Sequence, residues 1–147
     1  MIRKMLIALA LLLAAPAATQ AAQPRLQFAP PKPPAPFSAA VRVDDILYLS
    51  GQIGTGPDGK LVQGEAAQAR QTMDNIAEVL KAHGASMDDV FKCTVMLSDM
   101  SKWGEFNKVY ASYFKPDRLP ARSAFGTNGL VMNAFVELEC WAFVPKR

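Results

Sequence analysis

An arginine and two glutamates near the carboxyl end of the chain have the side chains needed for acid–base chemistry on a small anion. Arg122 lies in a segment with strand character, residues 121–126, and Glu137 and Glu139 lie in a second one, residues 134–143. Alternation along the second segment gives one face five residues: Phe135, Glu137, Glu139, Trp141 and Phe143. A carboxylate among aromatic rings must reach water, pair with a cation or have its pKa raised by desolvation. A raised pKa would suit a general acid or base.

Arg122 is the cation that could meet such a carboxylate. A planar guanidinium binds a carboxylate through two parallel hydrogen bonds, and that carboxylate is either Glu137 or part of a ligand. The same residue types on adjacent strands are also typical of an exposed ion pair, which contributes little to stability. The pattern by itself leaves a surface ion pair and a binding site as alternatives.

The elements that position these residues are predicted to form one α+β domain. Helical spacing predicts helices over residues 65–83 and 102–114, and strand character predicts five strands, over residues 38–43, 46–50, 90–97, 121–126 and 134–143. The stretch between the last two strands is rich in Gly and Asn, which predicts a hairpin. The second helix carries an aromatic stripe, which we interpret as core. We expect a single mixed sheet with two helices packed on one face.

The other face of this sheet has no partner within the chain. Depending on register, its apolar residues would come from Val41, Leu47, Val95 and Phe135. A second copy of the chain would bury them most simply, so we expect a homo-oligomer.

The first 21 residues are typical of a signal peptide. Arg3 and Lys4 precede an unbroken apolar run over residues 5–15, and small residues follow at 19–21. The run is shorter than the roughly 20 residues that span a bilayer, so we expect cleavage, export to the periplasm and no stable membrane anchor afterwards. The alternative is a retained amino-terminal anchor. The division is then a signal peptide, 1–21, a proline-rich arm, 22–37, and a folded domain, 38–147.

Charge and metal-binding residues exclude several classes of partner. Loss of Arg3 and Lys4 with the signal leaves 14 basic residues against 13 acidic ones, so the net charge falls from +3 to +1. This balance gives no reason to expect a nucleic-acid partner, which requires clustered basic residues. With one His and no Cys-x-x-Cys spacing, we expect no metal site.

The two cysteines, Cys93 and Cys140, both lie in predicted strands among apolar neighbours. We expect them to be small buried hydrophobic residues with free thiols. The alternative is a disulfide formed after export, and it depends on a geometry that the sequence does not supply.

Several segments, in this order, resemble the RidA family of small imine and enamine deaminases, also known as the YjgF/UK114 proteins. The resemblance covers residues 34–144 and includes Pro-Ala-Arg-Ser at 120–123 and Val-Glu-Leu-Glu at 136–139. The other segments are residues 34–38, 48–54, 71–76, 95–100 and 106–114.

The resemblance implies a chorismate-mutase-like fold assembled as a homotrimer, with three sites at the clefts between subunits. It implies that Arg122 binds the substrate carboxylate and that Glu137 positions and activates the water that attacks the C=N carbon. Ser50 and Gly51 would line the cleft, and Phe37 would lie over the substrate. The family's enzymes need no metal or organic cofactor, so we expect none here.

Two site positions depart from the pattern of the best-studied deaminases. Phe37 stands where that pattern has Tyr, and Ala124 stands where a Cys commonly lines the site. These apolar walls would suit a bulkier imine, or could weaken activity. Asn107, an unfavourable residue inside a helix, is added to the predicted binding residues. The predicted function is hydrolysis of 2-imino or enamine acids to 2-oxo acids and ammonia. The alternative is a non-catalytic trimeric binding protein for small carboxylates, or a chaperone-like protein, in the periplasm.

Overall fold

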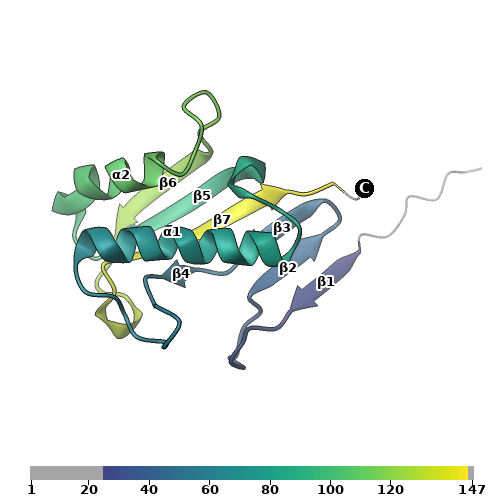
Figure 1. Cartoon of the computed structure of the whole chain (residues 1–147), viewed down its shortest axis with the longest axis horizontal. Helices are drawn as coiled ribbons and strands as arrows, with labels where there is room; N and C mark the ends of the chain where they lie inside the picture. Colours follow the sequence, from purple (N-terminus) through teal and green to yellow (C-terminus); the bar gives the residue numbers. More distant parts are fainter. Residues whose placement is uncertain (1–24, 146–147) are drawn as a thin grey trace, which may run out of the picture.

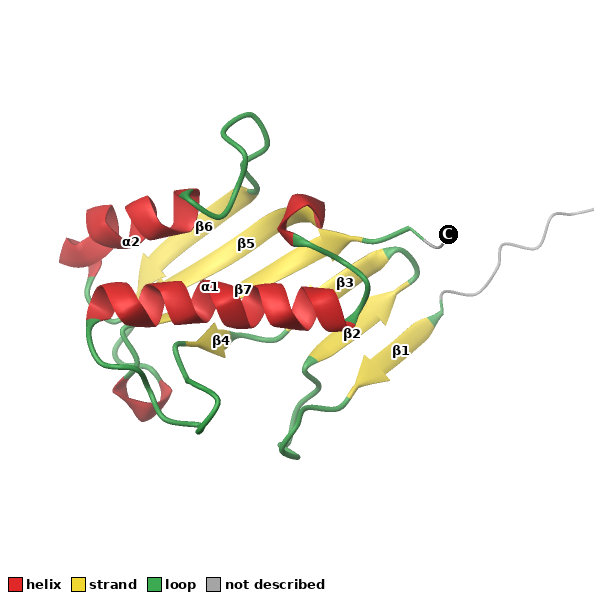
Figure 2. Cartoon of the chain, in the orientation of Figure 1, coloured by secondary structure: helices red, strands yellow, loops and turns green. Residues whose placement is uncertain are grey.

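A seven-stranded mixed sheet with two helices on one face makes up the fold (Figures 1 and 2). The computed structural model describes residues 25–145, so the predicted signal peptide lies outside the described residues. The helices are α1 (Glu65–Ala82) and α2 (Trp103–Ala111). The strands are β1 (Leu26–Ala29), β2 (Ala40–Val43), β3 (Ile46–Leu49), β4 (Gln52–Ile53), β5 (Val90–Leu97), β6 (Ala121–Gly126) and β7 (Val136–Phe143). Their order is β1-β2-β3-β7-β5-β6, and β4 also pairs with β7. The predicted fold class is confirmed.

Helix α1 forms where its apolar spacing predicts a helix. The residues at three- and four-residue steps all lie in the core: Ala69, Met73, Ile76 and Leu80. Gly84 follows with a φ of 73°, a left-handed conformation in which glycine avoids the strain that a side chain would bring. The buried stripe therefore covers the sheet, and the helix ends one residue before the predicted end at residue 83.

Amide side chains on α1 hold β4 and the start of β7 in place. Asn75 Nδ2 donates to the carbonyl oxygens of Ile53 and Thr55, at 2.9 and 3.0 Å. Gln68 Oε1 accepts from the backbone N–H of Phe135 at 2.8 Å, just before β7 begins. These bonds tie β4 and the start of β7 to the helix, and so set where the residues of both strands lie.

Strands β6 and β7 do not form the predicted hairpin. Strand β5 lies between them, pairing parallel with β6 and antiparallel with β7. A parallel pair needs a crossover connection, which α2 supplies between β5 and β6. The Gly- and Asn-rich residues 127–135 form a loop that passes β5, because turn residues mark a change of direction without specifying the next partner.

The two faces of β7 differ as alternation predicts. Val136, Leu138, Cys140 and Ala142 are buried beneath the helices, while Glu137, Glu139 and Trp141 are half-buried on the open face. The prediction that Phe135 lies on the open face is wrong. Phe135 precedes β7, so it does not follow the alternation of the strand, and it lies in the core with 6% of its surface exposed.

The open face carries aromatic residues, although they are not those predicted. Leu47 and Val95 point toward the helices and are buried, so their assignment to the open face is wrong, whereas Val41 is half-buried on it. Tyr48 and Trp141 pack edge to face with ring centroids 4.9 Å apart, and Phe91 packs on Trp141.

Cys93 and Cys140 form a disulfide, so the prediction of free thiols is wrong. The two residues are direct partners in the antiparallel pairing of β5 and β7, with Cα atoms 4.2 Å apart. This closeness follows from the register of two strands distant in sequence, which composition does not reveal.

The proline-rich arm begins with a strand. Residues 26–29 form β1, which pairs with β2 at the edge of the sheet, and the next proline in the chain is Pro30, where the strand has ended. This arrangement agrees with the lack of a backbone N–H in proline. Within residues 25–145, no helix has the length and apolar character needed to cross a membrane.

Candidate functional site

Glu137 lies on the open face of β7 with its carboxylate against the backbone of Gly51. A Cβ atom built on Gly51 would overlap Oε1 of Glu137, so a side chain at this position would require the carboxylate to move away. Burial, and secondarily the negative charge of Glu139, raises the pKa of Glu137. Of the three alternatives for a carboxylate on this face, the raised pKa of Glu137 agrees with partial desolvation.

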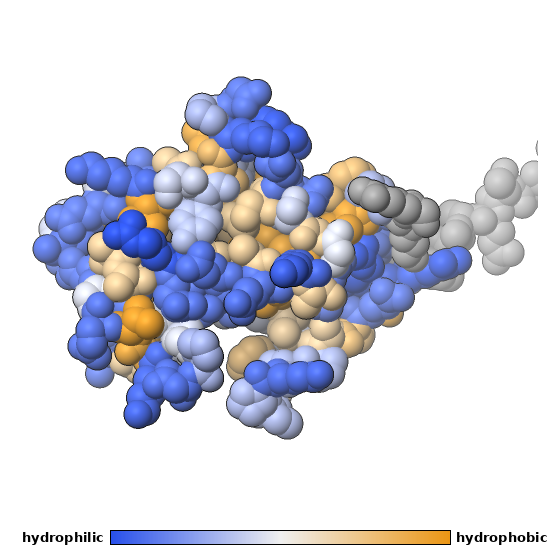
Figure 3. Space-filling view, in the orientation of Figure 1, coloured by the Kyte–Doolittle hydropathy of each residue, from blue (hydrophilic) through white to orange (hydrophobic). Residues whose placement is uncertain are grey.

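A hollow of about 650 Å³ adjoins Glu137 between the proline-rich arm and the sheet. Among its lining residues Glu137 alone is acidic, and Gly51 and Phe37 also line it. Most other lining side chains are apolar: Pro31, Pro33, Pro34, Ala35, Ala39, Ile53, Val79, Val131 and Met132. Figure 3 shows the surface hollowed between the arm and the loop that follows β4. The hollow can hold an organic molecule with an apolar part.

Ser50 acts on the arm and does not line this hollow. Its hydroxyl donates to the carbonyl oxygen of Ser38 at 2.6 Å, which ties the end of β3 to the residue after Phe37. Phe37 itself is 55% exposed. Ser50 therefore places the arm beside Glu137.

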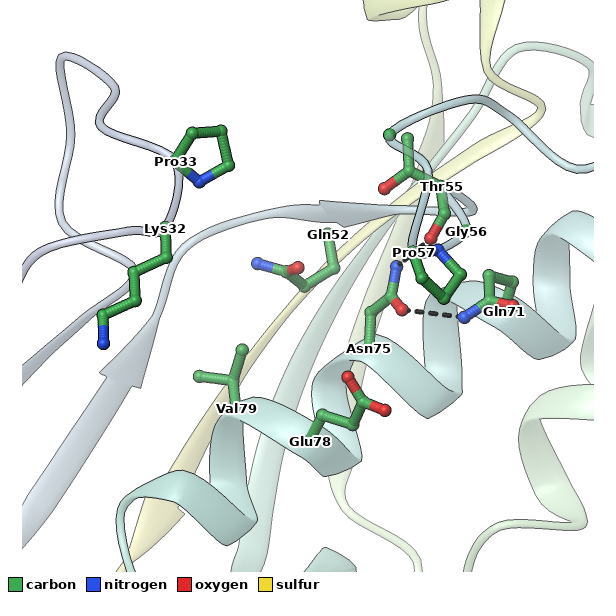
Figure 4. Close-up of a pocket in the computed structure, with 11 residues that line it drawn as sticks. Lys32, Pro33, Gln52, Thr55, Gly56, Pro57, Gln71, Asn75, Glu78 and Val79 are labelled. Atoms are coloured by element: carbon green, nitrogen blue, oxygen red, sulfur yellow. Dashed lines mark hydrogen bonds between the residues drawn. The ribbon is translucent and has the colours of Figure 1, made fainter.

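A second hollow of about 350 Å³ continues from the first along α1 (Figure 4). The two share five lining residues: Lys32, Pro33, Gln52, Thr55 and Val79. Its polar wall includes Gln71, whose Nε2 donates to Oδ1 of Asn75 at 2.9 Å. Because Asn75 in turn holds the loop after β4, these amides already have a structural role.

Arg122 lies on β6 with its side chain on the helix side of the sheet. It is the parallel partner of Cys93, and its Cζ atom is 4.4 Å from the ring centroid of Trp103 and 4.5 Å from that of Tyr110. The side chain makes no ion pair or hydrogen bond within residues 25–145, where the ion pairs are Lys102–Glu65 and Lys115–Asp88. Among the described residues, this half-buried cation is thus left without an anion.

The predicted site residues fall into two groups on opposite faces of the sheet. Asn107 lies one turn after Trp103 on α2, and Ala124 follows Arg122 on the same face of β6. Arg122, Asn107 and Ala124 therefore share the helix side. Glu137 faces the other way and lies with Phe37 and Gly51. Within one chain, Glu137 and Arg122 therefore do not form an ion pair.

Two residues near Arg122 were predicted only as core. These two residues are Trp103 and Tyr110, whose rings contact the guanidinium. Phe106 and Phe114, from the same aromatic stripe, are core residues as predicted. Burial raises the pKa of Tyr110 to about 12, although the charge of Arg122 opposes the shift. The spacing of seven residues that puts both rings on one helix face was a usable signal. The described part of the chain contains no cluster of three His, Cys, Asp or Glu side chains that could hold a metal ion.

Comparisons with known proteins agree on one family. The family model described as Endoribonuclease L-PSP matches residues 28–144. A RutC family protein of Sulfurisphaera tokodaii is 44% identical over 110 residues, covering 74% of this chain and 87% of that protein. A mouse protein named 2-iminobutanoate/2-iminopropanoate deaminase is 42% identical over 109 residues, covering 73% and 80%. The structure of YyfA from Yersinia pestis, of the conserved Rid family, matches with a TM-score of 0.76 at 36% identity, covering 82% of this chain and 100% of that one.

Proposed function

The chain belongs to the RidA (YjgF/UK114) family, and from that membership we propose that it hydrolyses reactive 2-imino and enamine acids to 2-oxo acids and ammonia. Arg122 is the observation that carries this proposal. Its guanidinium is half-buried, and no carboxylate of residues 25–145 neutralises it. A cation in this position is suited to a ligand carboxylate, which every 2-imino acid supplies.

Glu137 would perform the proton transfers. It accepts a proton from water as the oxygen attacks the carbon of the protonated imine, which gives a neutral carbinolamine. Glu137 returns that proton to the amino nitrogen. It then takes the hydroxyl proton as the C–N bond breaks, and releases it to solvent. The products are a 2-oxo acid, ammonia and one proton. A carboxylate with a raised pKa is suited to both accepting and returning a proton near neutral pH.

The reaction site would lie between two copies of the chain. Arg122 and Glu137 lie on opposite faces of one sheet, so one substrate can reach both only if they come from different copies. The aromatic residues of the open face, including Tyr48 and Trp141, favour burial of this face by other copies of the chain, and the family resemblance implies that the assembly is a homotrimer.

The substrate would be an imine with a large apolar side chain. The hollow beside Glu137 is far larger than a two- or three-carbon side chain requires, and its walls include Val79, Val131 and Met132. Each additional buried methylene group favours binding by about 0.8 kcal/mol. Phe37 and Ala124 extend the apolar character to the two positions that differ from the family pattern.

The proposed place of action is the periplasm. The signal-like residues 1–21 suggest export, and the disulfide between Cys93 and Cys140 is of a kind that forms and persists in oxidising compartments. The family model's description names an endoribonuclease. A net charge of about +1 after signal removal does not favour RNA binding.

A coupled assay tests the deaminase. An amino-acid oxidase generates imines from alanine, leucine and phenylalanine, and semicarbazide traps what escapes hydrolysis. We expect the protein to suppress trapping, most strongly with phenylalanine. Arg122→Ala should lower kcat/KM about 100-fold, because it removes charge-assisted hydrogen bonds to the substrate. Arg70→Ala, an exposed arginine on α1, is the matched control. A folded oligomer that suppresses nothing, yet binds 2-oxo acids, would instead indicate the carboxylate-binding protein.

A further inference from the structure

We propose that Trp103 and Tyr110 are positioning residues for Arg122, whose rings hold the guanidinium while its N–H groups remain free for the substrate carboxylate. This inference rests on the proposed function, because it assigns Arg122 the task of binding that carboxylate. It adds a role for two side chains of α2 that do not themselves touch the reacting atoms.

The geometry places both rings against one cation. The Cζ atom of Arg122 lies 4.4 Å from the centroid of Trp103 and 4.5 Å from that of Tyr110, well inside the roughly 6 Å range of a cation–π contact. The two residues are seven apart on α2, so they lie on the same helix face, two turns from each other. Arg122 reaches this face from the neighbouring strand β6.

Aromatic rings suit this task better than a carboxylate partner. An Asp or Glu paired with Arg122 would occupy the same N–H donors that a substrate needs, and would have to be displaced. A ring attracts the cation through its face and accepts no conventional hydrogen bond from it. The absence of an ion pair to Arg122 within the described residues fits a cation kept ready for an external anion.

The rings are themselves held in place by neighbouring aromatic residues. Phe106 packs against both, with centroids 6.1 Å from Trp103 and 5.8 Å from Tyr110, and Phe114 packs on Tyr110 at 4.9 Å. The Tyr110 hydroxyl is buried and has no hydrogen-bond partner among residues 25–145. The contact with Arg122 is therefore made by the ring and not by the hydroxyl. A long side chain held in this way loses less freedom when the substrate binds.

Substitution of Trp103 tests the proposal, since this residue is less buried than Tyr110 and its loss endangers the core less. We expect Trp103→Leu to raise KM about five-fold with kcat changed less than about two-fold, because carboxylate binding weakens without loss of the proton transfers. Trp103→Phe, which keeps a ring, should recover most of the KM. Calorimetry with 2-oxobutanoate should show the same five-fold loss of affinity without relying on turnover.

A double-mutant cycle separates positioning from a structural effect. In an Arg122→Gln background there is no guanidinium to hold, so Trp103→Leu should change kcat/KM and 2-oxobutanoate affinity no further. Equal losses in both backgrounds would overturn the positioning role and leave the deaminase standing. Arg122-dependent losses of affinity in a protein that hydrolyses no imine would overturn the deaminase and keep the positioning role. A wild-type protein that neither hydrolyses imines nor binds 2-oxobutanoate would overturn both.

Discussion

Glu137 occupies a position that favours chemistry over stability. Because burial raises its pKa, the folded chain binds the proton more tightly than the unfolded chain does. The contribution of Glu137 to the free energy of unfolding is therefore fully present below its ordinary pKa of 4.5. It is lost as the pH rises through the raised pKa. At neutral pH, the ionised carboxylate destabilises the fold that holds it.

Replacing Glu137 by an amide should therefore stabilise the protein and abolish its activity. We expect Glu137→Gln to unfold at a higher urea concentration than wild type at pH 7, with the difference vanishing near pH 4. Glu139→Gln is the companion variant on the same strand face. It removes a like charge that raises the pKa of Glu137, so the acid limb of the kcat/KM profile should move to lower pH. A Glu137→Gln variant no more stable than wild type at pH 7 would contradict this account.

Elements whose pattern is local were predictable, and pairings between distant elements were not. The stripe of α1 and the alternation of β7 follow from periods of 3.6 and 2 within each segment, so their buried faces could be assigned from the sequence. The neighbour of β6 depends on the crossover through α2, and the Cys93–Cys140 bond depends on register between β5 and β7. Strands β1 and β4 were missed, since one precedes a proline-rich segment and the other has two residues.

In the candidate site as well, the residues could be predicted from the sequence, whereas their placement relative to one another could not. Residue types identified Arg122, Glu137 and Gly51, and the family resemblance added Phe37. Glu137, Gly51 and Phe37 do lie together at one hollow. The separation of Arg122 from Glu137 by the sheet follows from the parallel placement of β6, which no local pattern indicates. The seven-residue spacing of Trp103 and Tyr110 indicates that their rings share a helix face, but their contact with Arg122 depends on the same placement of β6.

The disulfide joins the two central strands, β5 and β7, one of which carries Glu137. It connects cysteines 47 residues apart, and a cross-link closing a loop of this size typically adds about 2–4 kcal/mol to the free energy of unfolding. We expect urea denaturation with reducing agent to show a loss of this size. A Cys93→Ala/Cys140→Ala double variant should be insensitive to the reductant. Urea-unfolded, unreduced protein should react with no thiol reagent, and two reactive thiols per chain would refute the bond.

At the scale of the whole molecule, the sheet separates the two groups of residues that the proposed reaction needs. Arg122 lies on the helix side of β6 and Asn107 lies on α2, while the hollow with Glu137 adjoins the other face of β7. A cyclic trimer would place the first group of one copy against the second group of the next. Each proposed site then depends on two chains, and this dependence can be measured without a structure of the assembly.

Mixing two inactive variants should restore activity. Arg122→Ala lacks the carboxylate clamp and Glu137→Gln lacks the base, so each alone should have at most about a hundredth of wild-type activity. Equal amounts of the two variants are unfolded and refolded together. In each mixed trimer, one of the three clefts combines an intact Arg122 with an intact Glu137. Because trimers of a single variant also form and have no such cleft, the mixture should show about a quarter of wild-type activity per chain. A site contained within one chain would give none. Wild type refolded with an equal amount of an Arg122→Ala/Glu137→Gln double variant supplies the control. A cleft shared between chains predicts about a quarter of wild-type activity, and a cleft within one chain predicts about a half.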